Sequence, residues 1–234
     1  MIRTTPSEHS AEHSAASSVR PSRWVSTTVL ALSTLGATAL MSSAVHAETL
    51  ADRLSVCSGC HGEDGNSPVP DYPKLSGLDK EYIQKQLNDF KAGRRTSMIM
   101  ASMVEPIDPK EFAGLAKHFS EQKRSPAKPE DDKLVTDGKT IFDDGIVASA
   151  VPACAGCHND DGSGTDKYPR LARQHPGYIV TQLKAFKSGE RANDARDAMK
   201  AVAKRMSDKE IEAVAQYIAT LSGGEEEAAE GDKK

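Results

Sequence analysis

The chain of 234 residues is poor in aromatic side chains. Phe, Tyr and Trp together make up 5% of it, with a single Trp. The mean hydropathy is also low, at −0.52. A core built from side chains alone is thin for a chain of this length, and we suspect that a large apolar cofactor completes it.

The sequence also lacks an excess of positive charge. Its formal net charge is −4 and it has no long basic run, which argues against a nucleic-acid-binding protein. No convincing strand pattern is present. Beyond the first 47 residues there is no apolar stretch of membrane-spanning length, so we expect that part to be soluble.

The N-terminus has the layout of an export signal. Arg3, Arg20 and Arg23 precede an uncharged segment, residues 24–47, which ends in V-H-A. We predict a signal peptide over residues 1–47, with cleavage before Glu48. An uncleaved membrane anchor is the alternative. Both interpretations place the remaining chain outside the cytoplasm, and we expect the periplasm.

Cysteine is scarce, and its four copies fall in two C-x-x-C-H pentads, the attachment signature of c-type haem. Two thiols three residues apart reach two vinyl groups along one porphyrin edge, and the following His reaches the iron. The predicted cofactors are two covalently bound haem c groups. The predicted thioether cysteines are Cys57, Cys60, Cys154 and Cys157, and the predicted proximal ligands are His61 and His158.

C-x-x-C has two other common uses in proteins. A redox disulfide suits an exported protein, and two converging pairs suit structural zinc. Both leave the adjacent His unexplained. The repetition of the whole pentad favours haem.

The pentads belong to a longer repeat with a period near 97 residues. Y-P-K-L (72–75) matches Y-P-R-L (168–171), and helical segments 81–95 and 107–119 match 177–191 and 206–218. The predicted fold is all-α, with two tandem copies of a small helical domain, each wrapped around one haem. The predicted bounds are 48–124 for the first domain, 125–132 for a linker, 133–222 for the second domain and 223–234 for an acidic disordered tail.

One Met per half stands in register before the last helix. Met100 and Met199 lie 39 and 41 residues after the proximal His of their half, and we predict that they are the sixth ligands of the two irons. Met98 and Met103 compete with Met100. His175 is a rival to Met199.

Two further matched pairs have candidate roles. A backbone carbonyl at Pro73 and at Pro169 could accept the Nδ1–H of the proximal His and fix its ring, although both could be plain turn prolines. Arg95 and Arg191 could pair with haem propionates or could be solvated.

These motifs, twice in the same order from residue 50 to residue 221, resemble the dihaem cytochrome c4 family of class I cytochromes c. The resemblance implies close-packed haem domains, His/Met ligation by Met100 and Met199, and a periplasmic electron carrier that often feeds a terminal oxidase. The chain departs from the family at residues 76–78 and 172–174, where a Gly-Gln pair is usual, and in its acidic tail.

We therefore expect a protein that is no enzyme. It shuttles single electrons between membrane respiratory complexes, from a quinol-oxidising complex to a terminal oxidase, through transient contacts. It binds no nucleic acid, is a monomer, and associates peripherally with a membrane if its N-terminus is retained. The alternatives are a haem subunit of a larger dehydrogenase complex and a dihaem peroxidase-like enzyme with one open iron site.

Overall fold

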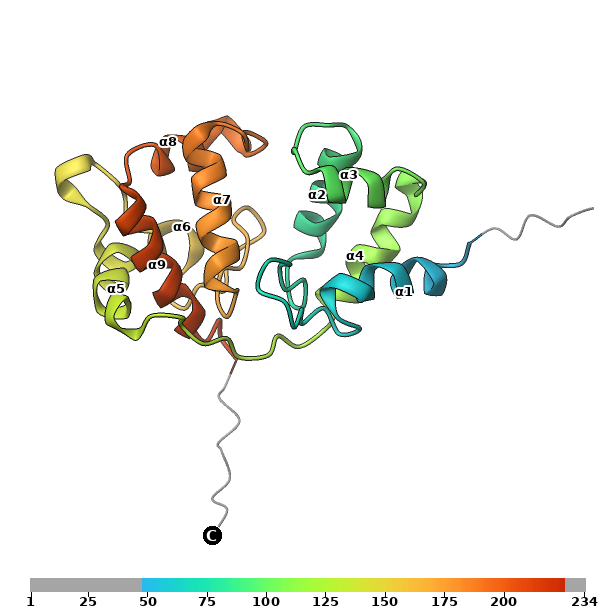
Figure 1. The fold of residues 1–234 in the computed structure, drawn as a ribbon, viewed down its shortest axis with the longest axis horizontal. Helices are drawn as coiled ribbons and strands as arrows, with labels where there is room; N and C mark the ends of the chain where they lie inside the picture. The colour runs from blue at the N-terminus through green and yellow to red at the C-terminus, as the bar shows by residue number, and fades with distance from the viewer. Residues whose placement is uncertain (1–47, 226–234) are drawn as a thin grey trace, which may run out of the picture. The chain divides into compact units, whose positions relative to one another are not determined.

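The computed structural model describes residues 48–225, which belong to one compact unit. The predicted signal segment 1–47 and residues 226–234 lie outside the described residues. Helices follow one another along the described chain (Figure 1), and its only β pairing consists of two isolated bridges, Arg95 with Arg191 and Ile146 with Val151. The all-α prediction is confirmed.

The first half contains four α-helices and one 3₁₀ turn within the described part. They are α1 (Leu50–His61), α2 (Lys80–Lys91), α3 (Met98–Val104), the turn Pro109–Glu111 and α4 (Phe112–Ser120). The second half repeats this plan after a short 3₁₀ turn at Asp132–Leu134. Its helices are α5 (Val135–Asp144), α6 (Ala155–His158), α7 (Pro176–Ser188), α8 (Ala198–Ala203) and α9 (Asp208–Thr220), with further 3₁₀ turns at Val147–Ser149 and Ala195–Asp197.

The last helix of each half begins at a capping box. Asp108 and Glu111 form one, with Pro109 at the first helical position, and Ser207 and Glu210 form the other. Each box satisfies two backbone N–H groups that would otherwise lack a partner. Helix α9 begins directly after its Ser207 cap, whereas the 3₁₀ turn Pro109–Glu111 separates Asp108 from α4.

The two halves differ just before the pentad. In the first half α1 runs straight through Cys57 and Cys60 and ends at His61. In the second half α5 ends at Gly145, which has φ +75°, and a loop closed by the Ile146–Val151 bridge leads to the separate α6. A Cβ on Gly145 would lie 2.3 Å from the carbonyl oxygen of Val151, so this turn requires glycine.

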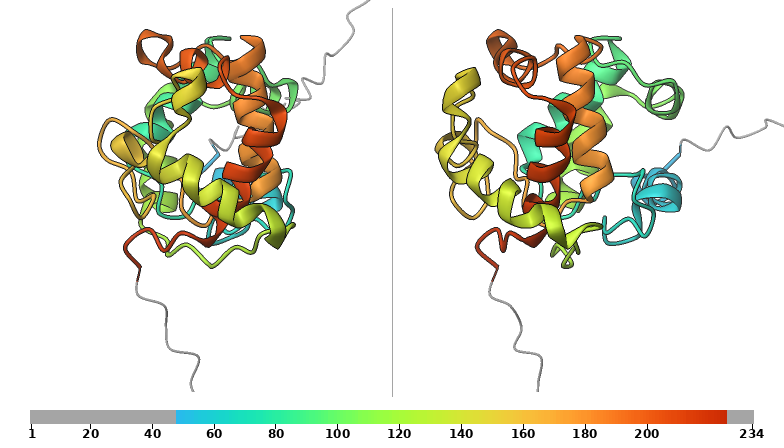
Figure 2. Two further views of the ribbon diagram at one scale, coloured as in Figure 1. Left: turned by 90° about the vertical axis from the view of Figure 1, so that its left-hand side faces the viewer. Right: turned by 60° about the vertical axis from the view of Figure 1, so that its left-hand side comes forward.

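Each half has its own apolar core. In the second half α9 packs against both α5 and α7, as the two views of Figure 2 show in red, yellow-green and orange. The core there includes Phe142, Phe186, Ile211 and Val214. In the first half α2 and α4 pack together, and the buried side chains form two clusters that share contacts with Leu54, Leu87 and Cys57. A cysteine of the pentad thus faces the core in each half, since Cys154 also packs against its cluster.

Candidate haem sites

In the first half, α1 delivers the pentad. Cys57 and Cys60 are half-buried, and His61 is the last helical residue and is 7% exposed. The chain then turns at Gly62, which has φ +81°. Nδ1 of His61 lies 2.9 Å from the carbonyl oxygen of Pro73, the contact predicted from the sequence.

The second half has the same His contact, although its pentad lies at a separate short helix, α6. His158 ends the short helix α6 and is 5% exposed. Its Nδ1 also lies 2.9 Å from a carbonyl oxygen, that of Pro169. Of the two alternatives for these prolines, the carbonyl contact with the His is the one that is present. That His61 and His158 are the proximal ligands stays a prediction. Because Nδ1 donates to the carbonyl, Nε2 is the nitrogen left with a lone pair for a metal.

A tyrosine edge supports each His ring. The ring centroids of Tyr72 and His61 are 6.3 Å apart, with an interplanar angle of 64°. Those of Tyr168 and His158 are 6.0 Å apart, with an angle of 61°. Both tyrosines belong to the repeated Y-P-x-L stretches, but no role was predicted for them. Their repetition next to the proline whose carbonyl contacts the His was the available sign of this contact.

Burial tunes the titratable groups of the pentads. It lowers the pKa of His61 and of His158, and the hydrogen bond to the proline carbonyl only partly offsets this. Both rings are therefore held neutral, the form that binds a metal. Burial also raises the pKa of the Cys57 thiol, and it raises that of Cys154 to about 11.

The methionines of the first half separate clearly by their surroundings. Met100, on α3, packs against the same apolar cluster as Cys57. Met98 is 90% exposed and Met103 is 44% exposed. Only Met100 of these three therefore faces the cluster that holds a pentad cysteine.

In the second half Met199, on α8, packs against the cluster that also contacts Cys154. Its backbone N–H donates to the Asp194 carboxylate over 2.6 Å, which fixes the start of the helix. Met206 is a 3% exposed core residue, as its match with Ile107 predicts. The rival His175 is turned toward the first half, where its Nε2 lies 3.0 Å from the Ser67 carbonyl oxygen.

The other cysteine chemistries find no support in residues 48–225. All four thiols are free there, and no group of three or more His, Cys, Asp or Glu side chains could hold a metal ion. The residues do fit haem. Each half joins a pair of cysteines, a neutral buried His with an oriented ring, and a Met on the same apolar cluster.

The two matched arginines are not solvated, contrary to one of the two expectations. Arg95 and Arg191 are each 8% exposed. Nη2 of Arg95 donates to the Tyr178 hydroxyl (2.9 Å) and to Oε1 of Gln182 (2.8 Å) in the second half. Nη2 of Arg191 donates to the Tyr82 hydroxyl (3.1 Å) in the first half. The arginines therefore build a reciprocal polar contact between the halves. The pairing with propionates stays a prediction.

Comparison with known proteins agrees with this geometry. The family model for cytochrome c matches twice, at residues 47–122 and 135–222. Cytochrome c4 of Pseudomonas aeruginosa is 39% identical over 193 residues, which cover 81% of this chain and 96% of the relative. The chain belongs to the cytochrome c4 family.

The crystal structure of reduced recombinant cytochrome c4 from Pseudomonas stutzeri superimposes with a TM-score of 0.69 at 37% identity, covering 75% of this chain and all of that one. A thiosulfate dehydrogenase electron acceptor of Thiomonas intermedia is 35% identical over 195 residues, covering 82% of this chain and 89% of the relative. This cytochrome c4 family member is thus a two-domain electron-transfer protein with two haem c groups. Among residues 48–225, none of the helices has the length and apolar character to cross a membrane.

Proposed function

We propose that the protein relays single electrons through two six-coordinate haems, one ligated by His61 and Met100 and the other by His158 and Met199. Cys57 and Cys60 bind the first haem, and the second pair of cysteines binds the second. One observation supports this proposal most directly. In each half, one Met packs on the same apolar cluster as a pentad cysteine, and the pentad His is buried and held by a proline carbonyl.

The protein's residues have distinct tasks in this relay. When bound, the haems supply a one-electron ferric/ferrous couple whose potential rises with Met/His ligation. The carbonyls of Pro73 and Pro169 keep each imidazole in one tautomer and orientation. Met100 and Met199 would complete the ligand sets of the two irons and would leave no open site for a substrate, which supports a carrier and no enzyme. The apolar clusters keep water away from both sites.

The ligand assignment is tested by replacing one methionine at a time. We expect Met100→Ala to lower the potential of one haem and to remove its Met–iron signature from the NMR spectrum, leaving the other haem unchanged. Met199→Ala gives the same result at the other haem. Met98→Ala is the matched control, since this neighbouring side chain is 90% exposed. Unchanged Met–iron signals in both ligand variants would contradict the assignment.

The proposed site of action is the periplasm, with a quinol-oxidising membrane complex as electron donor and a terminal oxidase as acceptor. The export-signal layout of residues 1–47 supports the location. The intact mass of the protein from its exported compartment tests it. We expect the chain from Glu48 plus two haems. A chain that begins near Met1 would instead indicate a retained anchor.

A second candidate function is electron acceptor of a dehydrogenase complex. The similarity to the Thiomonas thiosulfate dehydrogenase electron acceptor favours it. The two roles differ in what reduces the protein fastest. Reduction by a thiosulfate dehydrogenase and thiosulfate, faster than by a quinol-oxidising complex and its quinol, would select the second candidate.

A further inference from the structure

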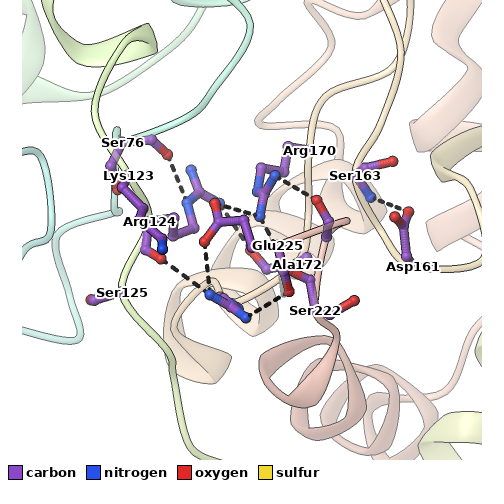
Figure 3. Close-up of polar contacts among 12 residues, drawn as sticks. Ser76, Lys123, Arg124, Ser125, Asp161, Ser163, Arg170, Ala172, Ser222 and Glu225 are labelled. Carbon is purple, nitrogen blue, oxygen red and sulfur yellow. Dashed lines mark hydrogen bonds and ion pairs between the residues drawn. The ribbon is translucent and has the colours of Figure 1, made fainter. Parts of the chain in front are cut away.

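Buried cations gather where the two halves and their linker meet. Lys74 is 3% exposed, Arg124 is fully buried and Arg173 is 6% exposed. The side chain of Arg170 is 10% exposed. Within residues 48–225, the one carboxylate that forms ion pairs with any of these four side chains is that of Glu225. Figure 3 shows Glu225 between Arg124 and Arg170.

Glu225 bridges two arginines of the second half. Its Oε1 accepts from Nη2 of Arg170 (3.1 Å) and its Oε2 accepts from Nη1 of Arg173 (2.7 Å). The backbone adds to this contact, since Nη1 of Arg170 donates to the Gly223 carbonyl (2.9 Å). Residues 223–225, assigned to the tail from the sequence, therefore dock on the second half.

The turn before Glu225 is shaped for this contact. Gly223 has φ +66° and Gly224 has φ +76°. A Cβ on Gly223 would lie 2.2 Å from Nη2 of Arg170 and 2.8 Å from the Cβ of Ala172. Only glycine at this position lets the guanidinium lie where the carboxylate can reach it.

The docked carboxylate is linked to the first half through Arg124, which directly precedes the linker. Nη1 of Arg173 also donates to the Arg124 carbonyl (3.3 Å). The Arg124 guanidinium donates to carbonyls of both halves: Ser76 (2.8 Å), Lys74 (3.2 Å) and Ala172 (3.1 Å).

The same carboxylate is linked to the second haem site. Arg170 directly follows Pro169, whose carbonyl fixes His158. Removing one partner of a buried ion pair leaves an uncompensated charge, which is strongly destabilising. Loss of the Glu225 charge therefore acts on the linker and on the loop that orients His158.

We propose that Glu225 is a positioning residue for electron transfer between the two haems, acting as a latch that holds the linker and the 169–174 loop in one arrangement. This inference rests on the proposed relay between two haems. Glu225 touches neither haem site directly and acts through Arg170 and Arg173.

The test uses the full haem-loaded protein and two variants. Glu225→Gln keeps the shape of the side chain and removes its charge, whereas Glu225→Asp keeps the charge. Glu212→Gln is the matched control, because Glu212 of the same half forms an exposed ion pair with Lys184. The first readout is backbone hydrogen exchange at residues 122–126 and 170–174. The others are the potentials of both haems and the rate of electron transfer between them.

For Glu225→Gln we expect at least tenfold faster exchange in both segments, a higher potential at the second haem and slower transfer between the haems. The potential rises because a negative charge that favours the ferric form is lost. Glu225→Asp and Glu212→Gln should remain close to the wild type. Unchanged hydrogen exchange in both segments of Glu225→Gln would refute the proposal that Glu225 holds the linker and the 169–174 loop, whatever the haem ligands are. Faster exchange with unchanged potentials and transfer rate would overturn the positioning role.

Discussion

Gly138 of α5 lies against the backbone of α9, so its substitution tests the packing of the second domain. A Cβ there would lie 2.1 Å from the carbonyl oxygen of Ala213 and 2.9 Å from the Cβ of Tyr217. Ordinary contact begins near 3.4 Å, so the Ala213 backbone must move by 3.4 − 2.1 = 1.3 Å to admit a methyl group. A backbone carbonyl within a helix cannot rotate away as a flexible side chain can.

The expected cost of Gly138→Ala follows from these distances. Overpacking costs about 1–3 kcal/mol, and a displacement beyond 1 Å belongs at the upper end. The higher helix propensity of Ala returns about 1 kcal/mol. We therefore expect a net destabilisation of about 2 kcal/mol, equivalent to a fall of roughly 4–8 °C in Tm for a chain of this size.

The assay is guanidinium and thermal unfolding of the haem-loaded protein, followed by circular dichroism. Gly177→Ala in α7 is the control, since the nearest atom to its added Cβ is Glu130 Oε1 at 3.8 Å. We expect the control to be neutral or stabilised by up to about 1 kcal/mol. If Gly138→Ala is as stable as this control, the packing of α5 on α9 described above is wrong.

Three further perturbations probe acid stability, the junction and the loop before the second pentad. Burial raises the pKa of Asp89, but hydrogen bonds from two cations and an amide outweigh it and hold that pKa below its usual value. Asp89 thus contributes stability above its unfolded pKa, which is lost as pH falls through the folded value. Asp89→Asn should lose less unfolding free energy than wild type between about pH 6 and about pH 3. Arg95→Lys cannot keep the forked contact with the second half and should cost about 2 kcal/mol in urea unfolding, whereas Arg94→Lys, on an exposed side chain, should change little. Gly145→Ala meets the Val151 carbonyl at positive φ and should cost more than about 1 kcal/mol in thermal unfolding.

The repeat in the sequence predicted local contacts within each half. The carbonyl contacts of Pro73 and Pro169 were among the candidate roles and are present. These features depend on residues close together in sequence, so spacing determines them. The loop before the second pentad was not predicted, because the repeat shows which segments match and does not show where a helix stops.

The junction was not predicted, for a physical reason. Arg124 is fully buried, yet it lies beside a segment rich in prolines and charges that indicates a solvated linker. Lys74 donates to the Ser125 carbonyl and to two neighbouring oxygens, and burial lowers its pKa to about 8. Periodicity reveals apolar faces, whereas a buried cation is recognisable only when its distant carbonyl partners are known.

The reciprocal contact did leave a trace in the sequence. Tyr82 and Tyr178 are 96 residues apart, and so are Arg95 and Arg191. Polar residues repeated in register, with no place in the apolar stripe, mark a surface that both halves use in the same way. Each guanidinium also stacks on a matched ring of its own half, at 4.6 Å from the Phe90 centroid for Arg95. Polar matches of this kind were the available signal for a contact between the domains.

The two sets of junction contacts have different physical consequences. The reciprocal set is self-complementary, as in a two-fold symmetric dimer, so a change at Arg95 or at Arg191 weakens an equivalent contact. The linker occurs once and joins the end of the first half to the start of the second, so its surroundings cannot be two-fold symmetric. The polar contacts beside it occur once: Arg124 donates to the carbonyls of Ser76 and Ala172, and Glu225 accepts from Arg173. A buried polar network specifies one arrangement only while each member is satisfied. The contacts of Glu225 lie on the loop that orients His158, so its charge acts on the second site more than on the first. Two sister domains thereby acquire different surroundings, and the potential of a bound haem depends on its surroundings.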